Sequence, residues 1–189
     1  NSNIYYFDGC RSDIFWGNGS VVLEIINYLL KFDKKILNKK ILMILPLGVG
    51  SLATPNSILL KENFKNSKIM ISESINYCKF YSYYSKSTSP SFKDTVAEGT
   101  AVKKLPLLSQ KYLKKTVDYI TILTENEIYK GIRYLYKKYN IVTEGAGAIP
   151  TATFISNQKF FMSFDYVLIP ICGNNIDSRI FNQIVFNTK

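Results

Sequence analysis

Short apolar runs alternate along the chain with longer segments in which apolar residues recur every three or four positions. Residues 41–47 form an uncharged apolar run, which is typical of a strand buried on both faces of a sheet. Further strands are expected at 4–7, 68–72, 119–123 and 166–171, and helices at about 20–30, 52–65, 104–115 and 125–139. Strands that alternate with helices predict an α/β fold with a parallel, doubly wound sheet in three layers.

Local signals mark several element boundaries. Thr124 and Glu127 have the spacing of a capping box, which predicts the start of a helix. Pro55 must lie in the first turn of the helix after residue 51, because a missing N–H costs little there. The small residues 145–148 begin a segment that could pack a helix closely against the sheet.

Composition narrows the possible classes of protein. With 189 residues, 47% of them hydrophobic, the chain fits a single folded α/β domain over residues 1–189. No apolar run is long enough for a membrane span, so no membrane partner is expected. The absence of His excludes a His-based triad and His-ligated metal. Cys10, Cys78 and Cys172 are odd in number and widely spaced, which favours free thiols in a reducing compartment such as the cytoplasm.

The net charge of +10 does not by itself indicate a nucleic-acid partner. Only Arg11, Arg133 and Arg179 are arginines, so 21 of the 24 basic residues are lysines. The Lys pairs are spread along the chain, which is more typical of solvated helix faces than of a nucleic-acid surface. We therefore expect no nucleic-acid partner.

A glycine loop directly follows the apolar run at 41–47. Residues 48–51 read Gly-Val-Gly-Ser and lead into an expected helix. Strand, glycine loop and helix N-terminus together form the local geometry that binds phosphate through backbone N–H groups. The same pattern also occurs in tight turns that bind no ligand, so the loop alone leaves both interpretations open.

Dinucleotide binding is one alternative for this loop. Gly48, Gly50 and Ala53 satisfy the relaxed G-x-G-x-x-G/A spacing, and Glu73 ends the next strand where a ribose-binding acid would lie. Against this alternative, Pro55 occupies a position where the helix should pack tightly on the strand.

Four further blocks carry a resemblance. They are Gly-Asn-Gly-Ser at 17–20, Thr-Val-Ala-Glu-Gly at 95–99, Val-Thr-Glu-Gly-Ala-Gly-Ala at 142–148 and Cys-Gly-Asn-Asn-Ile-Asp at 172–177. In this order and at these spacings, the chain resembles the C-terminal half of the threonine/serine dehydratase (ammonia-lyase) and serine racemase family. These are pyridoxal-phosphate (PLP) enzymes of fold type II. The resemblance implies a sheet like that of their larger domain, as in tryptophan synthase β, incomplete at its N-terminus.

The resemblance also implies a cofactor site for PLP. The phosphate would be held by the loop residues Gly48, Val49, Gly50, Ser51 and Leu52. Cys172 would face the pyridine nitrogen, and Glu144 would lie near the ring.

The same resemblance points to a cation site. Glu73 matches a cation ligand of serine racemase, but Tyr77 and Lys79 occupy the two positions that complete that site. An ammonium cannot ligate a monovalent or divalent cation, although it could stand in for one beside Glu73.

The family's Schiff-base Lys lies in a Ser-Phe-Lys-x-Arg-Gly segment of the N-terminal half, and this sequence contains no such segment. Ser91-Phe92-Lys93 is followed by Asp94-Thr95 and is interpreted as a coincidence, so no catalytic residue is predicted here. The expected function is PLP-dependent β-elimination of L-threonine or L-serine, if an N-terminal half supplies the Lys. Expected partners are a hydroxy amino acid and either further copies of the chain or that missing half.

Three alternatives to this function stay open. The first is serine racemase-type activity on the same scaffold. The second is a non-catalytic subunit that binds a phosphate ligand or a partner, and the third is the NAD-binding domain.

Overall fold

The computed structural model describes residues 12–86 and 88–186. The strand expected at 4–7, together with Cys10 and Arg11, lies outside these ranges. The strands are β1 (Ile41–Pro46), β2 (Ser67–Ser74), β3 (Tyr119–Leu123) and β4 (Tyr166–Leu168). The helices are α1 (Ser12–Gly17), α2 (Ser20–Phe32), α3 (Ala53–Asn63), α4 (Lys79–Ser85), α5 (Leu107–Thr116), α6 (Glu125–Tyr139), α7 (Gly145–Ser156), α8 (Gln158–Phe161) and α9 (Ser178–Phe186). Three short 3-10 turns cover Ile36–Asn38, Ile75–Tyr77 and Glu98–Thr100.

The described strands form one parallel sheet in the order β3-β2-β1-β4, which confirms the predicted topology class. Strand β1 pairs with β2 on one side, where Ile41 lies opposite Ser67, and with β4 on the other, where Ile41 lies opposite Tyr166. The chain thus leaves β1 in one direction to build β2 and β3, and later returns to the other side of β1 to build β4. The carboxyl ends of β1 and β4 therefore flank a point where the winding direction of the sheet changes.

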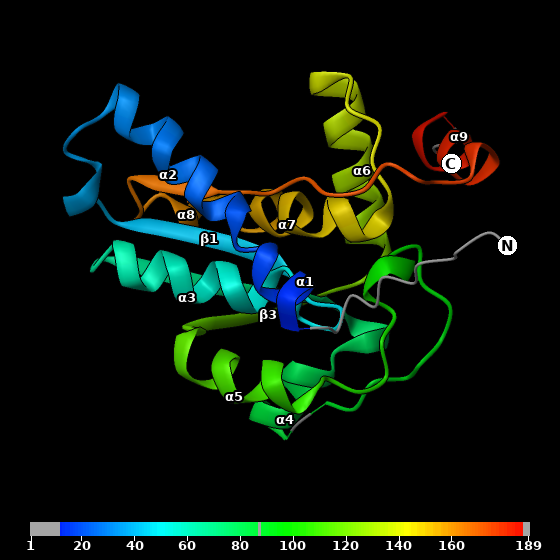
Figure 1. Cartoon of the computed structure of the whole chain (residues 1–189). Helices are drawn as coiled ribbons and strands as arrows, with labels where there is room; N and C mark the ends of the chain where they lie inside the picture. The colour runs from blue at the N-terminus through cyan, green and yellow to red at the C-terminus, as the bar shows by residue number, and fades with distance from the viewer. Residues whose placement is uncertain (1–11, 87, 187–189) are drawn as a thin grey trace, which may run out of the picture.

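Helices cover both faces of the sheet, as the three-layer prediction requires (Figure 1). Ile41, Met43 and Leu45 point to one face and pack in a core with residues of α2, α3 and α5. Leu42 and Ile44 point to the other face and pack near Phe161 of α8. All six residues of β1 are buried, because both of its faces and both of its edges are covered. A third cluster of buried residues joins α6 and α9 to α7.

The structure confirms some of the helix and strand boundaries that the sequence predicts. The capping box is present, since Glu127 N–H donates to Thr124 Oγ1 and Thr124 N–H donates to the Glu127 carboxylate. Pro55 is the third residue of α3, within its first turn. Strand β4, however, ends at Leu168 and not at 171 as predicted, because Pro170 cannot donate to a sheet ladder.

Other predicted boundaries are wrong by a few residues. Helix α5 begins at Leu107 and not at 104, because Pro106 occupies its N-cap. Residues 12–17, where the sequence analysis places no helix or strand, form the short helix α1. None of the helices within the described ranges is long and apolar enough to cross a membrane.

Asp118 joins the start of β3 to the rest of the sheet. Its carboxylate accepts hydrogen bonds from the Ile69 amide and from Lys68, each at 2.8 Å, and forms an ion pair with Lys61. Burial raises the pKa of Asp118, but the hydrogen bonds from Lys61, Lys68 and the Ile69 amide outweigh it and hold the pKa below its ordinary value. The folded state therefore favours the charged carboxylate.

We predict that Asp118→Asn lowers the free energy of unfolding at neutral pH by about 1–3 kcal/mol, because charge-assisted hydrogen bonds are lost. A depressed folded pKa contributes stability above the pKa of the unfolded chain, and this contribution disappears as the pH falls through the folded value. Denaturant unfolding should therefore show a difference between the two proteins at neutral pH that shrinks in acid. Asp94→Asn, at an exposed position, is the matched control; equal stability of Asp118→Asn and the parent at neutral pH would contradict the prediction.

Candidate functional site

A cleft lies at the carboxyl ends of β1 and β4, where the winding direction changes and where ligands bind in open α/β sheets. Its volume is about 180 Å³. The cleft brings together all seven residues expected to hold the cofactor: Gly48, Val49, Gly50, Ser51, Leu52, Glu144 and Cys172. Larger hollows exist elsewhere, including one of about 460 Å³ beside Lys103 and Lys104, so position and chemistry distinguish this cleft and size does not.

The glycine loop lines the cleft with residues whose backbone N–H groups are not paired with the rest of the described backbone. Within residues 12–86 and 88–186, the N–H groups of residues 48–51 donate no hydrogen bond to a backbone carbonyl. Gly50 has a φ of 91°, a conformation that L side chains rarely adopt, and a Cβ there would lie 2.5 Å from Ser109 Oγ. Val49 and Ser51 have no positive φ, which explains why side chains are tolerated between the two glycines.

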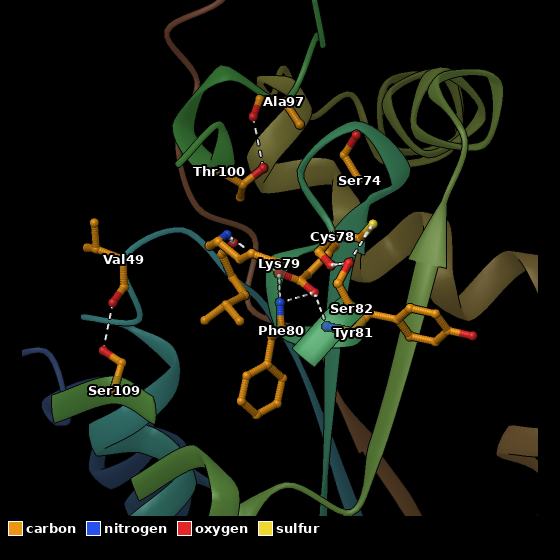
Figure 2. Close-up of polar contacts among 12 residues, drawn as sticks. Val49, Ser74, Cys78, Lys79, Phe80, Tyr81, Ser82, Ala97, Thr100 and Ser109 are labelled. Atoms are coloured by element: carbon orange, nitrogen blue, oxygen red, sulfur yellow. Dashed lines mark hydrogen bonds and ion pairs between the residues drawn. The ribbon is translucent and has the colours of Figure 1, made fainter. Parts of the chain in front are cut away.

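The loop is anchored on its outer side. Ser109 Oγ of α5 donates to the Val49 carbonyl at 2.7 Å, as Figure 2 shows. Beneath the loop, Thr54 Oγ1 is buried and has no hydrogen-bond partner among the described residues. Thr54 does not itself line the cleft, but the free amides and the positive-φ glycine fit an anionic group at this end of the cleft, such as the PLP phosphate.

Glu144 lines the cleft as the N-cap of α7, and its side chain makes no capping hydrogen bond. It lies close to two glycines, since a Cβ at Gly99 would be 3.2 Å from its Oε1 and a Cβ at Gly173 would clash with its carboxylate. Burial, and then the charge of Glu98, raise the pKa of Glu144.

Cys172 follows β4 and shares the cleft with Glu144. Burial, and then the charge of Glu144, raise the pKa of the Cys172 thiol, so the group is a neutral thiol at physiological pH. Gly147 of α7 explains how the helix approaches so closely, because any Cβ there would clash with the Cys172 carbonyl. The small-residue run at 145–148 thus brings the helix N-terminus against the segment after β4.

Glu73 does not line this cleft. Its buried carboxylate accepts hydrogen bonds from the Phe80 amide, at 3.1 and 3.2 Å, and from the Tyr81 amide at 2.8 Å. Lys79 Nζ lies 3.5 Å from Glu73 Oε1. These contacts occupy the carboxylate that the dinucleotide alternative needs for a ribose, so the structure gives that alternative no acid. Among the described residues, no three His, Cys, Asp or Glu side chains are grouped to hold a metal.

Sequence reasoning missed several contributors to the site. Gly99 and Thr100 line the cleft, and a Cβ at Gly48 would lie 2.9 Å from the Gly99 carbonyl. The block at 95–99 carried a signal for Gly99, whereas nothing in the sequence marked Ser109 as an anchor. Lys93 is exposed on a loop and does not line the cleft.

Comparison with known proteins adds the family to this geometry. The model of the family "Pyridoxal-phosphate dependent enzyme" matches residues 1–173. The chain belongs to this family. The cofactor of the family is pyridoxal 5'-phosphate, in agreement with the predicted cofactor. The predicted resemblance to threonine dehydratases and serine racemases is confirmed at the level of the family.

Individual relatives place the chain within the family. It is 28% identical to the L-threonine ammonia-lyase of Thermotoga maritima over 171 residues, which is 89% of this chain and 40% of that protein. Among solved structures, it is similar to threonine deaminase isoform 2 of Solanum lycopersicum (TM-score 0.73, 21% identity, 90% of this chain and 46% of that one). It is also similar to the serine racemase of Dictyostelium discoideum (TM-score 0.71, 23% identity, 88% and 52%).

The chain corresponds to only part of each relative. The chain spans less than half the length of the curated relatives that it matches. The structural likenesses, all at low identity, confirm the fold of this PLP-dependent enzyme family member and leave its own reaction to be inferred from the site.

The coupling between Glu144 and Cys172 can be tested by thiol chemistry. We predict that Glu144→Gln makes Cys172 alkylate severalfold faster at neutral pH, because removing the carboxylate charge lowers the thiol pKa and only burial still raises it. Peptide mass spectrometry after iodoacetamide treatment would follow Cys172 separately from the other two cysteines. Glu62→Gln, at an exposed position on α3, is the control, and unchanged alkylation in Glu144→Gln would show that the two groups do not interact.

Proposed function

We propose that this chain is the phosphate- and ring-binding portion of a PLP-dependent ammonia-lyase that acts on L-threonine or L-serine. The observation that carries the proposal is the cleft at the carboxyl ends of β1 and β4, which gathers the free loop amides, Glu144 and Cys172. The similarity to an L-threonine ammonia-lyase over 89% of this chain supports the choice of substrate.

The loop would hold the cofactor phosphate by backbone dipoles alone. No Lys or Arg lines the cleft in the part of the chain that the structure describes, so the amides of residues 48–51 and the N-terminus of α3 would provide the positive potential. Because these donors are fixed by the fold, little reorganisation would accompany binding.

Cys172 would meet the pyridine nitrogen as a neutral group. PLP withdraws electrons from the α-carbon of a bound amino acid, and the group at its ring nitrogen tunes how strongly it does so. A neutral thiol would not hold that nitrogen protonated as a carboxylate would. The electron withdrawal is then moderate, which suits loss of a β-hydroxyl as water.

Glu144 would control protons near the ring. Its raised pKa brings the carboxyl closer to neutral pH, where it can hold or release a proton. The amine that binds the cofactor covalently and removes the substrate α-proton would come from a Lys in the remaining half of the enzyme. Loss of the α-proton and the β-hydroxyl, followed by hydrolysis, would yield a 2-oxo acid and ammonia.

Cofactor binding tests the first part of this proposal. We expect Gly50→Ala to weaken PLP affinity by about tenfold or more, because a left-handed conformation costs an L side chain about 1–2 kcal/mol and the new Cβ meets Ser109. Titration followed by cofactor absorbance measures this change. Gly17→Ala is the matched control, since a Cβ there meets nothing within 4 Å. Absence of PLP binding to the unmodified chain would instead favour a subunit that does not bind the cofactor.

The reaction itself is tested on the full product of the coding region. The coding sequence upstream of Asn1 should be read for a Ser-Phe-Lys-x-Arg-Gly segment, and the resulting protein assayed with L-threonine and L-serine. The proposal expects 2-oxo acid and ammonia in equal amounts, and their loss when that Lys is replaced by Ala. Formation of D-serine without ammonia would favour racemisation, and a product without such a Lys would overturn the catalytic role.

A further inference from the structure

Lys79 is a buried lysine with an unusual set of partners. Its side chain is 6% exposed and that of Glu73 is 1% exposed. Lys79 Nζ donates to the Leu47 carbonyl at 2.9 Å, whereas Glu73 Oε1 lies farther away at 3.5 Å. The shorter contact is therefore to the backbone, one residue before the glycine loop. In Figure 2, Lys79 lies between the loop that bears Val49 and the helix that begins near Phe80.

Glu73 holds this cation in place from the other side. The carboxylate also accepts from the Phe80 and Tyr81 amides, so it binds the first turn of α4, which carries Lys79. Burial lowers the pKa of Lys79, and the charge of Glu73 opposes this effect. The side chain of Glu73 comes from β2 and the carbonyl of Leu47 follows β1. The contacts of Lys79 thus join two neighbouring strand ends and α4.

The direction of the Leu47 carbonyl decides the direction of an amide in the loop. A peptide unit is planar and trans, so its C=O and the following N–H point in opposite directions. Lys79 holds the Leu47 C=O, and therefore directs the Gly48 N–H away from itself. Ser109 acts in the same way on the peptide unit between Val49 and Gly50. Its hydroxyl donates to the Val49 C=O and therefore directs the Gly50 N–H away from α5. Both glycines line the cleft.

We propose that the Lys79 ammonium and the Ser109 hydroxyl are two positioning groups that orient the Gly48 and Gly50 amides toward a bound phosphate. Each binds a carbonyl on the outer side of the loop and touches no ligand itself. Lys79 is the internal cation of this arrangement, so the loop needs no external metal to keep its shape. The identity of the phosphate ligand rests on the proposed function, whereas the orientation of the amides in the free chain does not.

The first test follows the loop without any ligand. Lys79→Met keeps the unbranched apolar stem up to the position of Cε and removes the ammonium group with its charge and donors. We expect the NMR order parameter of the Gly48 amide to fall from about 0.85, typical of rigid backbone, to below about 0.6. Ser109→Ala should do the same to the Gly50 amide and leave β1 rigid. Lys103→Met is the control, because Lys103 is exposed and lines the hollow of about 460 Å³ that Lys79 also lines. Unchanged order at Gly48 in Lys79→Met and at Gly50 in Ser109→Ala would overturn the proposal.

Chemical rescue distinguishes positioning from general stabilisation. Lys79→Ala leaves space for a small cation between the Leu47 carbonyl and Glu73. Ammonium chloride should therefore restore the order parameter of the Gly48 amide, and the effect should saturate as the salt concentration rises. Tetramethylammonium chloride, which cannot donate a hydrogen bond, should not restore it, and Lys79→Met should respond to neither salt. Restoration by both salts, or by neither, would assign Lys79 a purely structural role. Should Lys79→Ala not fold, Lys79→Met and Ser109→Ala still decide the question.

Ligand affinity connects the loop to the proposed function. If the unmodified chain binds PLP, Lys79→Met should weaken PLP by about tenfold or more and leave pyridoxal, which lacks the phosphate, within about twofold. Equal weakening of both ligands would contradict the proposal. Failure of the unmodified chain to bind PLP would count against the proposed function alone, because the order parameters of Gly48 and Gly50 are measured without ligand.

Discussion

Parallel pairing of β1 on both of its edges is the constraint on which the rest of this structure depends. A strand with β2 on one side, β4 on the other and helices on both faces has no exposed side, so its sequence must be apolar throughout. The same pairing determines where the chain leaves the sheet after β1. At that point β2 and β3 are added on one side of β1, and β4 is added on the other side. The glycine loop follows β1 and Cys172 follows β4, so the pairing of these two strands places both at the same cleft.

The sequence predicted most of this arrangement because its signals are local. An uncharged apolar run, a capping box at Thr124 and Glu127 and a glycine pair each describe the conformation of a few adjacent residues. The order and spacing of the four sequence blocks then indicated the family, and with it the seven residues that the cleft brings together. Predictions failed at β4 and at the start of α5, where a single proline decides the boundary.

Contacts between distant segments could not be read in the same way. Ser109 lies 60 positions from Val49, and nothing about a serine in an amphipathic helix shows which carbonyl it will meet. Lys79 was recognised as an ammonium beside Glu73, but its shorter contact to the Leu47 carbonyl depends on how α4 returns across the end of the sheet. Such contacts can be identified only in the folded structure, because no local sequence pattern marks the residues that form them.

The alternation of Gly48-Val49-Gly50-Ser51 has a consequence for how this site can change over generations. Gly50 adopts a conformation that L side chains rarely adopt, and Gly48 and Gly147 lie against backbone atoms that a methyl group would displace. Val49 and Ser51 carry ordinary dihedral angles, so side chains there can vary while the amides keep their direction. Substitutions at Val49 and Ser51 can thus change the side chains that line the cleft while the N–H donors of the loop stay in place.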